Sequence, residues 1–138
     1  MAEFDIFSTD IEVRFRDIDA MGHVNNAVYF TYFESGRFKF FYSEPQKKKF
    51  PGFAFILAHV SCDYIRPVTM ADRLTLRMWI REIGSKSFKF QYQLVDAVDP
   101  AIVVATGESV QVCFDYATNI SVAISSAMQA QLSAYLEK

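Results

Sequence analysis

One segment of this chain, residues 25–42, has helical spacing and is apolar on most of its sides. It contains no proline, and Gly36 is its only glycine. Its apolar residues are Ala27, Val28, Tyr29, Phe30, Tyr32, Phe33, Phe38, Phe40 and Phe41. A helix without a polar face is normally buried, and Gly36 would let another stretch of backbone approach it closely. The rest of the chain is therefore expected to fold around this helix.

Five segments outside the helix have the pattern of strands, with apolar residues alternating with polar ones or forming long apolar runs. They cover residues 11–16, 53–65, 74–81, 88–94 and 103–114. Ile11, Val13 and Phe15 share one face of the first, residues 83–87 predict a hairpin, and residues 125–136 predict a closing helix. Consecutive strands joined by short turns imply an antiparallel sheet. We predict one α+β domain over residues 1–138, a five-stranded sheet wrapped around the central helix.

Composition and charge narrow the functional classes. Hydrophobic residues make up 51% of the chain, so it can bury a large core. Aromatic residues make up 16%, which suggests a buried interface or an apolar ligand slot. The net charge of −2, without a basic stripe, gives no case for nucleic acid, and the run Lys47–Lys49 is expected to be a solvated loop. The first ten residues lack the pattern of a signal peptide, and no apolar run approaches about 18 residues. We expect a cytoplasmic protein without a membrane span.

The two cysteines, Cys62 and Cys113, lie inside strand patterns and lack metal-ligand spacing. We expect buried free thiols, as in a reducing cytoplasm, and no metal site, because the chain has only two histidines. His59, Ser61 and Asp63 include the residue types of a hydrolase triad. On one strand face, however, successive members would be about 6.6 Å apart, too far for a hydrogen bond between nucleophile and base.

The junction between the first strand and the helix carries the polar groups that suggest chemistry. Within residues 14–29 these are Asp17, Asp19, Gly22, His23, Asn25 and Asn26. A helix N-terminus presents unpaired backbone N–H groups and a partial positive charge. A carboxylate beside such donors can attack a carbonyl or activate water, while the N–H groups bind the developing oxyanion.

A purely structural interpretation of the same residues also stands, because aspartate and asparagine build turns and Asn25 or Asn26 could cap the helix. In strand geometry Asp17 and Asp19 would point to opposite faces, so only one could serve a given site. Gly22 would give an acyl group room beside the backbone. His23 could orient the acid or a water molecule, or simply pack beside it.

Three pieces of this junction, Asp17-Ile18-Asp19, Gly22-His23-Val24-Asn25-Asn26 and Tyr29, closely resemble the signature of hotdog-fold acyl-CoA thioesterases of the 4-hydroxybenzoyl-CoA thioesterase-like family. Residues 63–67, 72–74 and 83–88 are similar to the family's later strands. The resemblance implies a curved antiparallel sheet around a central helix. It also implies a homodimer or homotetramer in which sheets join edge to edge and active sites lie at the dimer interface.

The resemblance further implies hydrolysis of an acyl-CoA to a carboxylic acid and coenzyme A, without a metal or organic cofactor. It places the catalytic aspartate at Asp19, as nucleophile or general base, and the thioester-polarising N–H groups around Asn26. The predicted catalytic residues are Asp19, His23 and Asn26, and the predicted substrate-binding residues are Asp17, Gly22, Val24, Asn25 and Tyr29. The alternatives are a hotdog-fold hydratase or dehydratase and a non-catalytic acyl-CoA binder.

Overall fold

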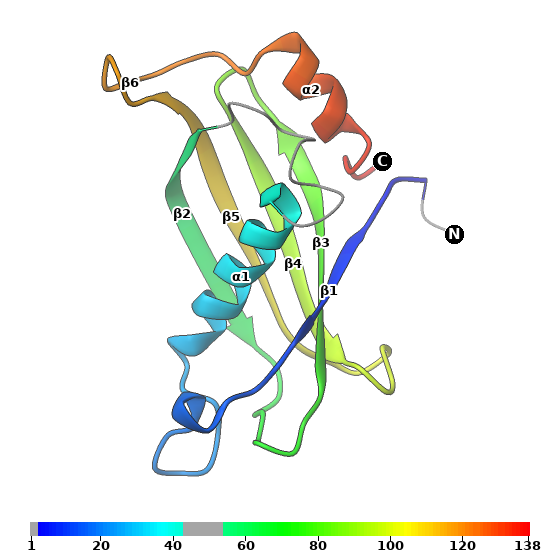
Figure 1. The fold of residues 1–138 in the computed structure, drawn as a ribbon. Helices are drawn as coiled ribbons and strands as arrows, with labels where there is room; N and C mark the ends of the chain where they lie inside the picture. Colours follow the sequence, from blue (N-terminus) through cyan, green and yellow to red (C-terminus); the bar gives the residue numbers. More distant parts are fainter. Residues whose placement is uncertain (1–2, 43–53) are drawn as a thin grey trace.

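The computed structural model describes residues 3–42 and 54–138, and the predicted loop containing Lys47–Lys49 lies outside them (Figure 1). The strands are β1 (Phe7–Ile11), β2 (Phe55–Tyr64), β3 (Leu74–Ile83), β4 (Ser87–Asp96), β5 (Val103–Asp115) and β6 (Ile120–Ser121). The helices are η1, a 3-10 turn (Phe15–Asp17), α1 (Val28–Tyr42) and α2 (Ser126–Ser133).

The main sheet is antiparallel and has the order β1-β3-β4-β5-β2. The short β6 pairs only with the end of β5, at Phe114 and Asp115. Figure 1 shows α1 lying across one face of this sheet. The predicted α+β architecture, five strands around a central helix, is therefore confirmed.

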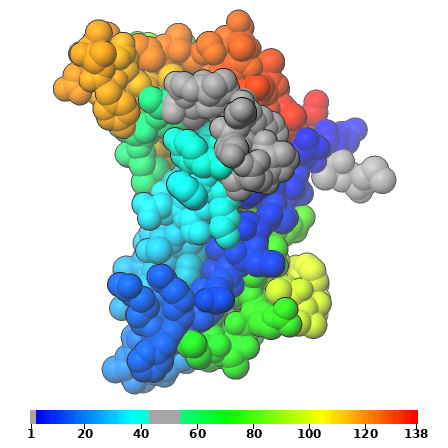
Figure 2. Space-filling model, viewed as in Figure 1, coloured from blue at the N-terminus to red at the C-terminus, as the bar shows by residue number. Residues whose placement is uncertain are grey.

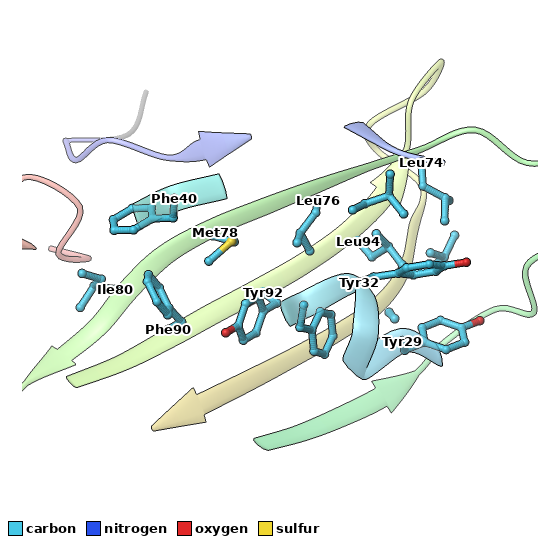
Figure 3. Packing of buried hydrophobic residues seen from close by; sticks show 14 of the residues in the cluster. Tyr29, Tyr32, Phe40, Leu74, Leu76, Met78, Ile80, Phe90, Tyr92 and Leu94 are labelled. Atoms are coloured by element: carbon cyan, nitrogen blue, oxygen red, sulfur yellow. The ribbon is translucent and has the colours of Figure 1, made fainter. Parts of the chain in front are cut away.

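The core lies between α1 and one face of β3 and β4, the face formed by every second residue of each strand (Figure 3). The buried residues of these strands include Leu74, Leu76, Met78, Ile80, Phe88, Phe90, Tyr92 and Leu94. They meet Tyr32, Phe33 and Phe40 of the helix, all nearly or fully inaccessible to solvent. The period-two alternation in the sequence thus identified the buried face of both strands, because successive side chains of a strand point to opposite sides.

Gly36 allows α1 to sit this close to the sheet. A Cβ atom placed on it would overlap the side chain of Leu76 and lie 2.7 Å from Met78 Sδ. The prediction that another backbone approaches Gly36 is wrong in one respect: the neighbours are side chains of β3. The loss of helix propensity at this glycine, about 1 kcal/mol, is offset by the close packing that it permits.

The first predicted strand is shifted in the structure. β1 ends at Ile11, not Arg16, and Phe15 is 84% exposed although the alternation placed it on the apolar face. The cause is local, because Asp17 Oδ2 accepts a hydrogen bond from the backbone N–H of Arg14 at 2.9 Å and the chain turns into η1. Asp17, not Phe15, is the buried member of this turn.

Two other predictions concern how the remaining elements are joined. The predicted hairpin is confirmed, with Gly84 N–H donating to Ser87 O at 2.7 Å between β3 and β4. The closing helix is shorter than predicted. Ser125 caps α2 through a hydrogen bond from Met128 N–H to its Oγ, and the helix ends at Ser133.

Candidate active site

Asp17 is a buried structural carboxylate, with 2% of its surface exposed. Its Oδ2 accepts hydrogen bonds from Arg14 N–H and Tyr32 O–H, both at 2.9 Å, and its Oδ1 faces the Arg14 guanidinium at 3.3 Å. Burial by itself would raise the pKa of Asp17. The hydrogen bonds from Arg14 and Tyr32 outweigh it, and the pKa lies below the ordinary value of 3.8.

Replacing Asp17 by asparagine is therefore expected to destabilise the fold by about 1–3 kcal/mol at pH 7, because the side chain loses its charge and one of its two acceptor oxygens. A carboxylate whose pKa is lowered by folding stabilises the protein above pH 3.8, and that contribution disappears as pH falls through the folded-state pKa. Urea denaturation at pH 7 and pH 3 measures both effects. The exposed Asp10→Asn variant is the control. An equal difference from wild type at both pH values would contradict this account.

Asp19 lies two residues further on, in an exposed turn. Its Oδ1 accepts hydrogen bonds from the backbone N–H groups of Met21 at 2.9 Å and His23 at 3.2 Å. Its own N–H donates to His23 O at 2.8 Å. These bonds fix the carboxylate in the turn through Oδ1. The other oxygen, Oδ2, has no hydrogen-bond partner among residues 3–42 and 54–138.

Gly22 and His23 complete this turn. Gly22 N–H donates to Asp19 O at 3.1 Å, and the glycine has φ +82°, a left-handed conformation that side chains with a Cβ rarely adopt. Nothing lies within 4 Å of where its Cβ would be, so the surface is open there. His23 is tied to Asp19 through its backbone, and its imidazole is half-buried in the pocket described below.

Of the backbone N–H groups of residues 24–26, just before α1, two already have a hydrogen-bond acceptor within the protein. Val24 N–H donates to Val68 O at 2.8 Å, and Asn25 N–H donates to Asp17 O at 2.9 Å. Asn25 Oδ1 in turn accepts from Ala27 N–H at 2.9 Å, as a capping side chain does. In the described part of the chain, Asn26 N–H has no acceptor. The predicted oxyanion donors around residues 24–26 are thus narrowed to Asn26, because the other two amides are already paired.

The helix itself begins at Val28, three residues later than Asn25, where the sequence pattern placed its start. The intervening residues form a tight turn, closed by Val28 N–H donating to Asn25 O at 2.9 Å. Asn26 lies in this turn, exposed to solvent, and the turn keeps its amide out of the regular hydrogen bonds of α1. In Figure 2 the blue segment that carries these residues stands at one end of the molecule.

Tyr64, at the end of β2, orients the turn from across the site. Its hydroxyl donates to Asn26 O at 2.7 Å, and its ring meets the ring of buried Tyr29 edge to face with centroids 4.8 Å apart. Burial raises the pKa of Tyr29, so its hydroxyl stays protonated at neutral pH. Sequence reasoning gave Tyr64 no role, since its partner Asn26 lies far away along the chain.

One pocket collects most of the predicted site residues. It is lined by Asp19, His23, Val24, Asn26, Tyr29, Tyr64, Ile65, Arg66 and Pro67. Asp17, Gly22 and Asn25 do not line the pocket. Their backbone hydrogen bonds, from Asn25 N–H to Asp17 O and from Gly22 N–H to Asp19 O, hold the turn that carries the lining residues. The pocket therefore combines a carboxylate, an unpaired backbone N–H and an aromatic wall, which is what addition to a carbonyl requires.

Arg66 is a second residue of this pocket that sequence reasoning left without a role. Its guanidinium lies 3.4 Å from Asp72 Oδ1 and 3.9 Å from Asp96 Oδ2, which places the positive charge at the rim. Its Nε is buried and has no hydrogen-bond partner. The local sequence, an arginine before a proline just after a strand, offered no signal for a contact with Asp72, six residues away, or with the more distant Asp96.

The other chemical interpretations find no support in the described residues. His59 and Asp63 are exposed along β2, and Ser61 lies between them on the same strand. No group of three metal-ligating side chains occurs in residues 3–42 and 54–138. Cys62 and Cys113 are free but half-buried, not fully buried as predicted, because β2 is an edge strand and Cys113 lies near the end of β5. Burial raises the pKa of Cys62 to about 11 and also raises that of Cys113, so neither is a thiolate at neutral pH.

The model of the thioesterase-like superfamily matches residues 13–132, nearly the whole chain. The chain belongs to this superfamily. In fold the chain resembles solved structures of hotdog-fold thioesterases, such as a predicted thioesterase from Bacillus stearothermophilus. The TM-score with that structure is 0.84 at 24% identity, over 97% of this chain and 98% of that one.

Three proteins are similar in sequence to this chain, and two of them are named as enzymes that act on acyl-CoA. The long-chain acyl-CoA thioesterase FadM of Escherichia coli is 27% identical over 90% of this chain and 95% of its own length. The 1,4-dihydroxy-2-naphthoyl-CoA hydrolase of Nostoc punctiforme is 32% identical over 79% of this chain and 74% of its own length. The uncharacterised YsmA of Bacillus subtilis is 30% identical over 62% of this chain, a match that spans 58% of that protein.

No helix in the described residues is long and apolar enough to cross a lipid bilayer.

Proposed function

We propose that this protein is an acyl-CoA thioesterase that hydrolyses the thioester to a carboxylic acid and free coenzyme A. The observation that carries the proposal is that one pocket is lined by both Asp19 and Asn26, and that the backbone N–H of Asn26 has no acceptor in the described residues. A thioester carbonyl placed between them would meet a nucleophile or base on one side and an oxyanion donor on the other. The two curated relatives named above are enzymes of acyl-CoA hydrolysis, which supports the same reaction.

In the proposed mechanism, Asp19 Oδ2 attacks the thioester carbon or removes a proton from an attacking water molecule. Asn26 N–H then hydrogen-bonds the developing oxyanion, and removal of such a donor typically raises the barrier by about 3 kcal/mol. The bond from Tyr64 O–H to Asn26 O holds the turn, so the donor is oriented before the substrate arrives. Collapse of the tetrahedral intermediate releases the thiolate of coenzyme A, which takes up a proton. When water attacks, the free acid forms in the same step. When Asp19 attacks, the acyl group remains on Asp19 as a mixed anhydride, which water then hydrolyses to the free acid and regenerates the carboxylate.

The proposed assembly is a homodimer joined through β2. This strand is the outer edge of the sheet beside β5, so its other side has no strand partner in the described chain. Along it, Ile56, Leu57 and Tyr64 are 37%, 46% and 43% exposed, an unusual apolar content for a free edge. Pairing two β2 edges would cover these side chains and bring a second subunit next to the candidate site. Sedimentation equilibrium measures the resulting mass.

The test of the function is thiol release from a panel of acyl-CoA substrates with short, medium, long and aromatic acyl groups. We expect coenzyme A to appear together with the free acid, in equal amounts, from at least one class. The panel includes the two substrate types in the names of the relatives, a long-chain acyl-CoA and an aromatic acyl-CoA such as 1,4-dihydroxy-2-naphthoyl-CoA. A hydratase or an acyl-CoA binder would release no thiol, so absence of release from every substrate by the folded protein would refute the proposal.

A further inference from the structure

A chain of buried polar side chains crosses the core beneath α1, away from the candidate active site. Tyr92 and Ser109 are fully buried and Gln111 is 3% exposed. The Tyr92 hydroxyl and Ser109 Oγ are 2.6 Å apart, Ser109 Oγ donates to Gln111 Oε1, and Gln111 Nε2 donates to Phe88 O at 3.2 Å. Burying three polar side chains among aromatic rings is costly unless each is satisfied, and here each is.

This run of hydrogen-bonded side chains ends at the positively charged guanidinium of Arg37. Arg37 Nη1 donates to the Tyr92 hydroxyl at 2.9 Å, and its guanidinium carbon lies 6.0 Å from the Tyr92 ring centre. Arg37 is half-buried, and no carboxylate in the described residues forms an ion pair with it. A guanidinium has five N–H donors in a fixed fork, of which this contact uses one. The buried chain therefore holds a positive charge in place and leaves most of its donors available.

Arg37 faces a groove between α1 and β2. Two adjoining hollows form this groove; both are lined by Glu34, Arg37 and Leu57, and they extend from Phe30 and Val60 to Phe41 and Phe55. Its walls are mainly apolar, and Gln111 lies at its floor. Glu34 lines the same groove, but its side chain is exposed to solvent, whereas Arg37 is turned inward by its bond to Tyr92.

The groove and the active-site pocket both border the first turn of α1. Tyr29 lines the active-site pocket and Phe30 lines the near end of the groove, so the same helix borders both. From the start of α1 at Val28 to Arg37 the axis advances about 14 Å, at about 1.5 Å per residue. An acyl chain whose thioester sits beside Asp19 and Asn26 would lie along this helix and bring its far end to Arg37.

We infer that Arg37 selects acyl groups that carry a carboxylate at the end remote from the thioester. The inference rests on the proposed function, because it assumes that the groove holds the acyl chain of the substrate and that the proposed pairing of two β2 edges leaves the groove open between α1 and β2. The apolar walls suit a methylene chain, and the unpaired guanidinium at its far end suits an anion in a bidentate contact. An unsubstituted chain would leave the Arg37 donors without an acceptor in an apolar site, which is unfavourable.

The experiment compares kcat/KM for dodecanedioyl-CoA and dodecanoyl-CoA, which differ only in the terminal carboxylate. We expect the wild-type protein to favour dodecanedioyl-CoA by about tenfold or more, and Arg37→Met to lose or reverse that preference while still hydrolysing dodecanoyl-CoA. Lys39→Met removes a positive charge from the same helix but does not line the groove, so its preference should match wild type. Equal preference in wild type and Arg37→Met would overturn the inference.

Two further measurements keep the result decisive. If Arg37→Met does not fold, Tyr92→Phe removes the hydroxyl that orients Arg37, and an unchanged substrate preference in that variant would count against the inference. If neither substrate is hydrolysed, the proposed function has failed, and calorimetry with dodecanedioic and dodecanoic acid tests the groove directly. Tighter binding of the diacid by wild type, lost in Arg37→Met, supports the role of Arg37, and equal binding of the two acids refutes it.

Discussion

Replacement of Asp19 by asparagine is expected to reduce thioester hydrolysis by about 10²- to 10⁴-fold, the usual contribution of a catalytic acid or base. Asparagine retains an oxygen at the position of Oδ1, so the hydrogen bonds from Met21 N–H and His23 N–H can persist. It lacks the negative charge and the basicity that attack on a thioester or activation of water requires. The turn should therefore survive while the chemistry is lost.

The measurement is steady-state thiol release by wild type and Asp19→Asn on the best acyl-CoA of the panel. Thermal unfolding of both proteins accompanies it, and we expect similar midpoints because Asp19 is exposed. Asp10→Asn is the matched control, an exposed aspartate of β1 that is not part of the pocket lining. Full activity in Asp19→Asn would eliminate this carboxylate as the catalytic group.

Replacement of Phe40 by alanine should produce the largest loss of stability, about 3–5 kcal/mol. Phe40 is fully buried, and its ring lies edge-on to those of Phe7, Phe90 and Tyr135 at centroid distances of 5.5, 5.1 and 4.9 Å. Removing it would open a cavity where β1, β4 and the C-terminal segment meet α1. Rigid aromatic neighbours cannot collapse fully into such a space.

Phe38→Ala on the same helix provides the control, because Phe38 is 63% exposed. Its change in the free energy of unfolding should stay within about 0.5 kcal/mol. Urea denaturation at a fixed protein concentration measures both variants, since the stability of an oligomer depends on concentration. Comparable losses of unfolding free energy in Phe38→Ala and Phe40→Ala would contradict the prediction that burial of the side chain determines the destabilisation.

Much of the fold follows from local pattern. The alternation in residues 74–81 and 88–94 predicted the buried faces of β3 and β4, since a period of two is a property of extended backbone itself. The apolar helix predicted a buried α1 for a similar reason. The pattern failed at Phe15, where two local preferences compete. Alternation favoured a strand, but the hydrogen bond from Arg14 N–H to Asp17 turns the chain into η1.

The candidate site was predicted less completely. The motif around Asp19 and Asn26 located it, and the structure brings both residues to one pocket. It did not reveal Tyr64, whose contribution depends on a hydrogen bond to a residue in another element. Nor did it distinguish Asp17 from Asp19 by environment, since one is buried and bonded to Tyr32 while the other is exposed.

The sequence by itself therefore determined the class of fold and the family, and it predicted the segment that we propose carries the chemistry, because these depend on periodicity and on residues close together in the chain. Only the tertiary structure decided which groups are free to act. Val24 N–H is occupied by Val68 O, and Arg37 is held by Tyr92, in both cases by partners from distant elements. Local sequence specifies which donors and acceptors exist, but folding decides which of them are paired, and those left unpaired are available to a substrate.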